Sequence, residues 1–297
     1  MKYEIRHKTR YRYEEEATFA QCVLRLQPMT MRDQILHEFS LQIDPHPARI
    51  EERIGEFGEK VVQVLIDTPH HDLEITAHSV VETRRAPHLS LFQGKSTRQF
   101  HDEGFAMADL GPSCPASFLF PTSRTPLSAE ITDYARKSFL PDRPVFDAAF
   151  ELARRIHDDF VYDPKATDVS TAPALAFSKR RGVCQDFAHV MICGIRGLGL
   201  PAAYVSGYLR TIPPPGKERL QGADATHAWV SVWCGQEMGW IGIDPTNAMV
   251  VQNDHIVLSW GRDYGDVAPI EGVILSGGGQ SLKVEVDVIP LTQKARA

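Results

Sequence analysis

The sequence has no long apolar run and no excess of basic charge. No stretch of about 18 apolar residues is present, so no membrane-spanning helix is expected. Lys and Arg total 32 against 38 Asp and Glu, and this net charge of −6 argues against a protein that binds nucleic acid through a basic face. The first residues, MKYEIRHKTR, are charged where a secretion signal is apolar. We therefore expect a cytoplasmic protein with neither a membrane nor a nucleic-acid partner.

Cysteine is scarce, and its number is odd. A disulfide scaffold would have more cysteines in a shorter chain, and no CxxC pair suggests a zinc knuckle. The 43% apolar and 24% charged residues are typical of a globular protein, and 297 residues suggest about two domains at roughly 150 residues each. We expect free thiols, so the question is which one reacts: Cys22, Cys114, Cys184, Cys193 or Cys234.

The first part of the chain has the two-residue period of β-strands. In KYEIRHKTRYRY, tyrosines and other apolar side chains alternate with mostly charged ones, and the pattern recurs at 22–28, 35–44, 60–67 and 72–83. No helical pattern separates these segments. They predict an antiparallel β-sandwich or barrel over residues 1–110, followed by a linker at 111–127 that is rich in Pro, Gly and Ser.

The second part, residues 128–297, has helical spacing first and strands afterwards, which predicts an α+β domain. Ser128 is a suitable N-cap for one helix, and Pro144 stands near the start of a second. A third helix is expected to begin at Cys184 and to end at Gly199. Strands are predicted in the segments 202–209, 226–233, 239–244, 255–260, 271–276 and 281–289.

Cys184 is the cysteine best placed for chemistry. At the first turn of a helix its sulfur meets unpaired N–H groups and the positive end of the helix dipole, which favour a thiolate. The cations at 179–181 precede it, and Gly182 permits a sharp turn. The alternatives are a solvated charge run and a cysteine that only packs in the core. Cys193 projects from the opposite side of the same helix, so we expect it to pack in the core.

A nucleophilic thiol needs a base, and the base needs an orienting partner. WVSVWCGQEMGWIGI is typical of a hairpin that turns near 236, so position 227 should face position 245. His227 and Asp244 should then come within contact. Asp224 and Asn247 are alternative orienting residues.

Other interpretations of these residues remain open. A zinc site made of Cys184, His227 and Asp244 is one, although structural zinc prefers sulfur-rich ligand sets. His189 lies about 140° around the helix from Cys184, where a packing or hydrogen-bonding role is expected. The sequence has no Walker loop, HExxH or GxSxG motif.

Three segments together resemble the transglutaminase-like superfamily of transglutaminases, microbial cysteine proteases and peptide N-glycanases. They are RRGVCQDFAHVMICGIRGLGLPAAYVSGYL, DATHAWVSVW and GWIGIDPTN, within about 65 residues. The resemblance implies a papain-like α+β core with a Cys184–His227–Asp244 triad, and it implies no cofactor and no metal. Many members have Glu where this chain has Ser231, and no acidic cluster suggests a calcium site.

The N-terminal KYEIRHKTRYRY and the later GRDYGDVAPI extend the resemblance to a bacterial branch with its own N-terminal β domain. The reaction expected is thiol-dependent acyl transfer on an amide of a peptide or protein, ending in hydrolysis. The alternatives are transfer to an amine and a scaffold without turnover. The backbone N–H of Cys184 would bind the oxyanion. Further oxyanion or cleft residues are expected among Tyr162, Gln185, Trp229, Arg262, Asp263 and Tyr264; the oligomeric state is left open.

Overall fold

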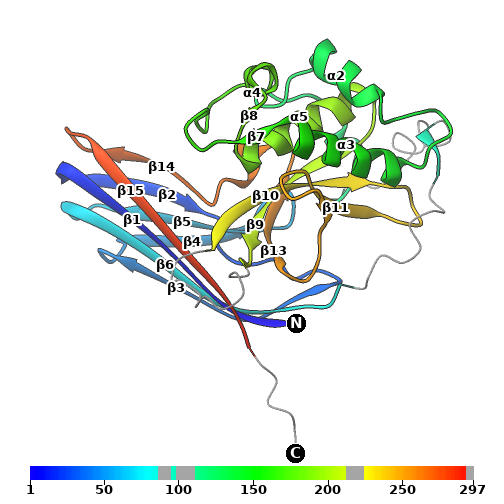
Figure 1. The fold of residues 1–297 in the computed structure, drawn as a ribbon. Helices are drawn as coiled ribbons and strands as arrows, with labels where there is room; N and C mark the ends of the chain where they lie inside the picture. Colours follow the sequence, from blue (N-terminus) through cyan, green and yellow to red (C-terminus); the bar gives the residue numbers. More distant parts are fainter. Residues whose placement is uncertain (86–94, 98–110, 212–223, 292–297) are drawn as a thin grey trace, which may run out of the picture.

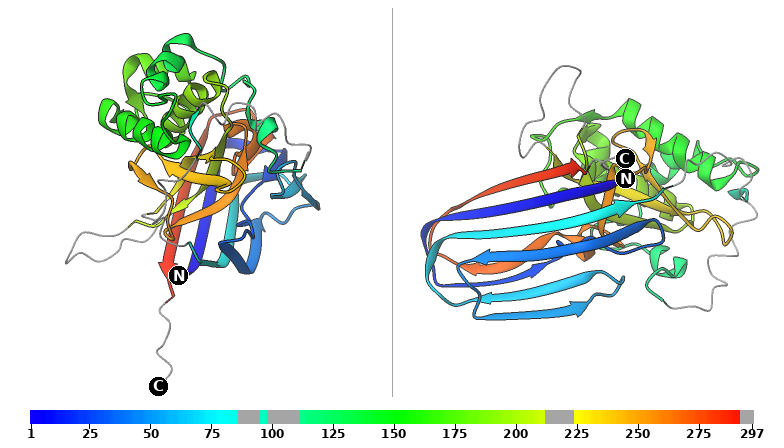
Figure 2. Two further views of the ribbon diagram at one scale, coloured as in Figure 1. Left: turned by 90° about the vertical axis from the view of Figure 1, so that its right-hand side faces the viewer. Right: turned by 90° about the horizontal axis from the view of Figure 1, so that it is seen from below.

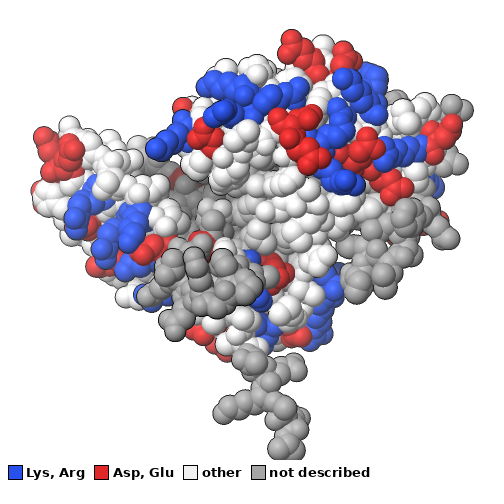
Figure 3. All heavy atoms as spheres, viewed as in Figure 1, with Lys and Arg blue, Asp and Glu red and all other residues white. Residues whose placement is uncertain are grey.

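Two four-stranded antiparallel sheets form a sandwich, and a third, five-stranded sheet beside them carries the helices (Figure 1). The computed structural model describes residues 1–85, 95–97, 111–211 and 224–291. The predicted α+β class is confirmed. In these described ranges no helix is long and apolar enough to cross a bilayer, and Lys and Arg are interspersed with Asp and Glu over the face in Figure 3.

The sandwich contains the strands predicted near the N-terminus. One sheet has the order β15-β1-β6-β3 and the other the order β14-β2-β5-β4. The short β4 was missed because all of its residues are exposed on an edge strand, so the sequence shows no alternation there. The bounds are β1 Lys2–Ala17, β2 Phe19–Leu24, β3 Gln34–Asp44, β4 Arg49–Ile54, β5 Lys60–Ile66, β6 His70–Thr83, β14 Ile270–Leu275 and β15 Gln280–Pro290.

Both ends of the chain contribute to the sandwich. β15 pairs with β1 from Tyr3↔Pro290 to Tyr13↔Gln280, and β14 pairs with β2 (Figure 1). The prediction that these last strands belong to the catalytic domain, 128–297, is therefore wrong: alternation identifies a strand but not its partner. Of the predicted domain 1–110, residues 86–94 and 98–110 lie outside the described residues, and its boundary stays a prediction.

The five-stranded sheet has the order β12-β11-β10-β9-β13. Helices gather on one of its faces, as the left view of Figure 2 shows. The strands are β9 Ala202–Leu209, β10 Ala225–Trp233, β11 Trp240–Asp244, β12 Met249–Val250 and β13 His255–Gly261, with the short pair β7 Val161–Tyr162 and β8 Arg181–Gly182. The helices are η2 Pro115–Phe118, α2 Ala129–Arg136, α3 Val145–Asp159, α4 Pro173–Lys179, α5 Cys184–Gly197 and α6 Tyr264–Val267.

The helix α5 lies at the centre of this half. It begins at Cys184 as predicted, and Gly199 just beyond its end has a φ of 76°. Its apolar side chains pack on Tyr204 and Val230 of the sheet. The other face of the sheet is covered partly by Phe118, which is fully buried although it lies in the segment predicted as a linker.

One face of the long strands β1 and β15 spans two cores. Near one end of β1, Tyr13 packs against the second sheet of the sandwich. Near the other end, Tyr3 and Ile5 pack with Tyr208 of β9. The sandwich and the helical half therefore share one supporting sheet, seen from below in the right view of Figure 2.

Candidate active site

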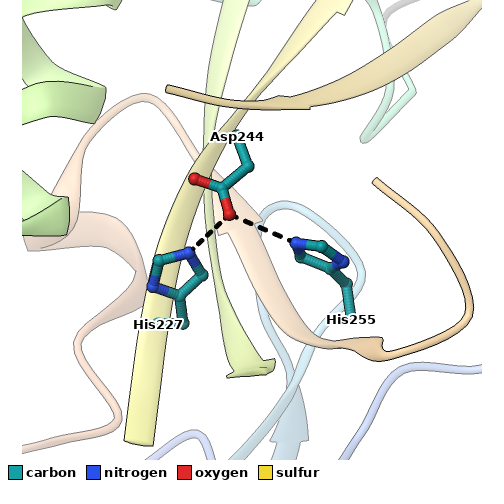
Figure 4. Close-up of side chains that lie close together, drawn as sticks. All are labelled: His227, Asp244 and His255. Carbon is teal, nitrogen blue, oxygen red and sulfur yellow. Dashed lines mark hydrogen bonds and ion pairs between the residues drawn. The ribbon is translucent and has the colours of Figure 1, made fainter. Parts of the chain in front are cut away.

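His227 and Asp244 meet across the β10–β11 hairpin. The ladder pairs Val230 with Ile243, and its continuation places position 246 opposite His227, one residue from the predicted 245. His227 Nε2 lies 2.8 Å from Asp244 Oδ2, and both side chains are buried (Figure 4). The predicted histidine–carboxylate contact is present.

Asp244 is a fully buried carboxylate that accepts hydrogen bonds on both oxygens. Oδ2 is contacted by His227, by His255 Nε2 at 3.3 Å and by the Asn247 side-chain amide at 2.7 Å. Oδ1 accepts the backbone N–H groups of Thr246 and Asn247. Burial alone would raise the pKa of Asp244, but the bonds from His227, His255 and Asn247 hold it well below its usual range. The carboxylate is therefore charged and fixed in position.

His255 is a site residue that the sequence reasoning missed. The Gln252 N–H donates to His255 Nδ1 at 3.4 Å, so Nε2 carries the proton and donates to Asp244. Burial lowers the pKa of His255 and outweighs the Asp244 carboxylate, which leaves the ring neutral. The signal was a histidine at the start of HIVLSW: a buried strand rarely carries a polar side chain without a partner.

Cys184 differs from the other four cysteines in its exposure. It is half-buried at the first residue of α5, while the other four are buried. Burial raises the pKa of Cys22 to about 11 and that of Cys193 to about 12, and it also raises that of Cys234. These thiols are poor nucleophiles at neutral pH, since the thiolate is the reactive form.

His227 interacts with Cys184 as well as with Asp244. Burial lowers the pKa of His227, but hydrogen bonds with Asp244 and Cys184, together with their charges, outweigh it and raise the pKa to about 10. Nε2 is taken by Asp244, which leaves Nδ1, pointing away from Asp244 in Figure 4, for the sulfur. The Asp244 carboxylate therefore orients the imidazole, which can exchange a proton with the Cys184 thiol.

Local contacts make α5 begin at Cys184. Asp186 Oδ2 accepts the Val183 N–H at 2.8 Å and the Thr167 hydroxyl at 2.7 Å, which caps the helix and fastens a neighbouring loop. A Cβ on Gly182 would lie 2.5 Å from Asp186 Oδ2, so this close approach requires glycine. The turn expected at Gly182 thus serves to place the sulfur at a capped helix start.

Two protein-family models match this chain. Residues 3–82 match the bacterial transglutaminase-like N-terminal region, and residues 132–245 match the transglutaminase-like superfamily. An uncharacterized protein of Mycobacterium tuberculosis is 39% identical over 294 residues, which cover 97% of this chain and 93% of that protein. The chain belongs to the transglutaminase-like superfamily.

A crystal structure and a further protein are also similar to this transglutaminase-like chain. A crystal structure of a candidate cysteine protease from Cytophaga hutchinsonii matches it with a TM-score of 0.74 at 22% identity, covering 99% of this chain and 92% of that one, and so shares its fold. A protein-glutamine gamma-glutamyltransferase of Pseudomonas aeruginosa is 31% identical over 129 residues, which are 42% of this chain and 19% of that protein.

The three cations before Cys184 make contacts away from the sulfur of this transglutaminase-like core. The Arg180 guanidinium lies over three aromatic rings, 4.0 Å from the centroid of Phe177. Lys179 donates to a backbone carbonyl, and Arg181 pairs with Asp163 at 3.4 Å. They stabilise the loop, while His227 and the start of α5 supply the positive potential at the thiol.

Tyr162 and Gln185, predicted near the oxyanion, both lie beside the start of α5. Tyr162 is half-exposed and pairs with Gly182 through the short parallel strands. Burial, and then the charge of Cys184, raise the pKa of Tyr162, so its hydroxyl stays protonated near the sulfur. Gln185 Nε2 donates to the Val169 carbonyl at 3.0 Å and holds that loop in place.

Trp229 does not line an open cleft, and this prediction is corrected. Its side chain is 1% exposed, and its ring meets His255 edge-on with centroids 5.2 Å apart. The alternation of β10 places Trp229 on the same side as His227, where it packs against the histidine pair. It can support these rings but cannot touch a substrate.

The predicted cleft segment around Arg262 forms a turn held by its own side chains. Arg262 pairs with Asp266 at 2.9 Å, and Asp263 caps α6 by accepting the Gly265 N–H at 2.6 Å. The Tyr264 N–H donates to His189 Nε2 at 3.3 Å, which gives His189 the hydrogen-bonding role expected of it. Arg262 and Tyr264 remain partly exposed, whereas Asp263 is buried.

Of the alternative orienting residues, Asn247 contacts the pair and Asp224 does not. The Asn247 amide donates to Asp244 Oδ2 and lies 3.5 Å from His227 Nε2. Asp224 instead accepts the N–H groups of Thr211 and Val288, both at 2.6 Å, and so ties this half to the sandwich. Asn247 therefore supports the orientation that Asp244 provides.

A metal could find three ligands in this cluster. One atom each of His227, Asp244 and His255 lies within 4.8 Å of the others. The same carboxylate oxygen, however, accepts the Asn247 amide, whose hydrogens would face a cation. This arrangement of donors suits a hydrogen-bonded carboxylate better than a metal centre. The cluster also differs from the zinc site considered from the sequence, because it contains His255 where that site would contain Cys184.

Proposed function

We propose that the protein hydrolyses an amide bond of a peptide or protein, a peptide or isopeptide bond, through a thioacyl intermediate on Cys184. One observation carries the proposal: His227 Nε2 is hydrogen-bonded to the buried Asp244 carboxylate at 2.8 Å, and the interactions of the ring with Asp244 and Cys184 raise its pKa to about 10. This pairing suits an imidazolium–thiolate nucleophile. His227 and Asp244 complete the proposed triad, which needs no metal or cofactor.

The proposed reaction uses each side chain in turn. The Cys184 sulfur attacks the amide carbonyl carbon, and a C–S bond forms while the carbonyl oxygen takes the negative charge. As the C–N bond breaks, the proton on His227 Nδ1 passes to the departing amine. His227 then takes a proton from water, whose oxygen attacks the thioester and releases the acid and the thiolate. Asp244 keeps the imidazole oriented throughout.

The oxyanion would be stabilised at the start of α5. The backbone N–H of Cys184 belongs to the first turn, whose N–H groups have no partner within the helix. We propose the Tyr162 hydroxyl as the second donor, since Tyr162 pairs with Gly182 just before Cys184 and its ring lies 6.4 Å from that of Phe187 in the first turn of α5. A Tyr162→Phe variant should lower kcat with little change in KM.

Transfer to an amine is a second candidate. It is favoured by the printed name of the Pseudomonas relative, a protein-glutamine gamma-glutamyltransferase, which is similar over 129 residues. Mass spectrometry of a glutamine- and lysine-containing peptide separates the two reactions. Cleavage of the peptide, or deamidation of its glutamine, indicates that water is the acceptor and the reaction is hydrolysis. An isopeptide-linked product indicates transamidation.

A scaffold without turnover is the non-enzymatic alternative, and thiol reactivity distinguishes it from the enzyme. Iodoacetamide near neutral pH should label Cys184 well before the four buried cysteines. Cys184→Ala should abolish turnover, and Cys193→Ala serves as the matched control on the same helix. Retained turnover in Cys184→Ala, or slow and uniform labelling of all five thiols, contradicts the proposal. Unpaired cysteines fit a reducing compartment, so we also propose a cytoplasmic location.

A further inference from the structure

A cavity lies at the seam between the sandwich and the catalytic half. Its volume is about 120 Å³. Thr9 and Tyr11 of β1 and Leu282 and Val284 of β15 line it from the sandwich side. The seam forms because the face of β1 and β15 passes from the core of the sandwich to the core shared with Tyr208.

The cavity adjoins the candidate active site. Its other wall includes Thr226, the residue before His227, and Tyr264 at the start of α6. The Tyr264 ring meets the Tyr204 ring edge-on, with centroids 6.3 Å apart. Tyr204 belongs to the buried core against which both Cys184 and Tyr264 pack. Tyr204 and Tyr264 therefore connect the cavity with the nucleophile.

The lining is uncharged. None of the described residues that line the cavity is acidic, lysine or arginine. His7 is the titratable imidazole there; burial lowers its pKa to about 4, and its two nitrogens are occupied by Tyr208 and Thr9. Hydroxyl groups and aliphatic side chains make up most of the surface. Such a site favours a neutral group over a charged one.

An apolar stripe on β15 continues from the buried core into this cavity. Val286 and Val288 are buried against the catalytic half, while Leu282 and Val284, on the same side of the strand, are 57% and 43% exposed. Exposed apolar side chains beside a cavity commonly mark a binding surface. The exposed part of the stripe, Leu282 and Val284, lines the cavity.

We infer that this cavity binds one apolar side chain, aromatic or long aliphatic, of the peptide whose amide carbonyl reaches Cys184. The inference rests on the proposed function. A cavity of about 120 Å³ suits a single side chain, since an apolar cavity of roughly 150 Å³ holds one benzene molecule. The sandwich thus contributes directly to substrate selection, with Leu282 and Val284 as specificity-determining residues.

The test measures alkylation of Cys184 by peptidyl chloromethyl ketones, which needs no turnover. Two series of N-terminally blocked probes are compared. In one, leucine or phenylalanine occupies in turn each residue position before the chloromethyl ketone; in the other, glycine or aspartate occupies the same position. The variants are Leu282→Asp and Val284→Asp, whose side chains are exposed enough to permit folding. Val273→Asp is the matched control, because Val273 is 63% exposed on β14 and does not line the cavity. Iodoacetamide reports the intrinsic reactivity of Cys184 in every variant.

At one residue position of the probe, we expect leucine or phenylalanine to make alkylation of Cys184 about 10-fold or more faster than glycine or aspartate does. Leu282→Asp and Val284→Asp should lose this preference, whereas Val273→Asp should keep it, with iodoacetamide rates unchanged in all three. Suppose that iodoacetamide labels Cys184 rapidly, but the probes show no preference for apolar residues, or a preference that Leu282→Asp and Val284→Asp leave unchanged. That result overturns the inference about the cavity and leaves the proposed function standing. Slow labelling of Cys184 by every reagent overturns the proposed function as well.

Discussion

Two histidines share one carboxylate oxygen, yet their surroundings give them opposite properties. His227 and His255 both contact Asp244 Oδ2, at 2.8 and 3.3 Å, and both are buried. The pKa of His227 is raised to about 10, while that of His255 is lowered. The difference lies in Cys184, whose interaction helps to raise the pKa of His227, and in the backbone N–H of Gln252, which occupies His255 Nδ1.

This contrast distinguishes two roles of the histidines that contact Asp244: proton transfer and positioning. His227 faces an ionisable sulfur and can hold and release a proton. His255 is closed on both nitrogens and stays neutral, so we assign it a positioning role that acts through Asp244. Changes that remove the carboxylate should affect both histidines, and changes at either ring should affect them differently.

Removal of the shared charge should have the largest effect. Asp244→Asn keeps the shape but leaves His227 without the acceptor that orients it and favours its protonated form. We expect kcat/KM to fall by roughly 10⁴-fold, as for the equivalent change in a serine protease triad, in steady-state assays on a cleaved peptide. A variant with more than half of the original kcat/KM would show that Asp244 does not orient His227.

Loss of His255 should have a smaller effect that is still specific. His255→Leu removes a hydrogen bond to a charged group, a change of about 1.5–3 kcal/mol, so we expect kcat to fall by about 10–100-fold with little change in KM. The alkaline limb of the pH–rate profile should also shift, which a purely structural role would not cause. His70→Leu, which alters a buried histidine of the sandwich, is the matched control. Equal effects in both variants would contradict a positioning role.

The contributions of the two histidines to the free energy of unfolding should depend on pH in opposite directions. His227 has a raised pKa, so its contribution is complete below pH 6.5 and is lost as the pH rises through about 10. His255 has a lowered pKa, so its contribution is present above pH 6.5 and is lost as the pH falls below that value. Thermal unfolding between about pH 4 and 10 should therefore show a weaker alkaline decline in His227→Gln and a weaker acid decline in His255→Gln. Parallel curves would show that the two sites do not differ.

Chelation should have the smallest effect. Asn247 donates to the same oxygen that a metal would need, so prolonged dialysis against EDTA should leave kcat/KM within about twofold of its starting value. Loss of activity that zinc restores would instead indicate that the two histidines and Asp244 bind a metal.

The sequence predicted the parts of the site that depend on local order. The start of α5 follows from a glycine turn and helical spacing, and the contact of His227 with Asp244 follows from the length of one hairpin. Both involve residues close together in the chain. The same reasoning could not place His255, because its approach to Asp244 depends on the order of strands β13, β9, β10 and β11 in the sheet.

The fold shows the same limit. Alternation correctly predicted β15 as a strand, but its pairing with β1 joins residues more than 250 positions apart, which no local pattern specifies. The cavity at Leu282 and Val284 could not be predicted for the same reason, since it exists where the end of the chain returns to its beginning. Trp229 was misplaced because the H-A-W segment indicates its strand but not what covers it.

The most direct test is a ¹⁵N NMR titration of the histidine rings. Our account predicts that both nitrogens of His227 remain protonated at neutral pH and that the ring loses a proton only near about pH 10, while His255 stays neutral. In Cys184→Ala the midpoint for His227 should fall. A His227 ring that loses its proton near pH 6.5, and does so equally in both proteins, would contradict the proposed pairing of thiolate, imidazolium and carboxylate.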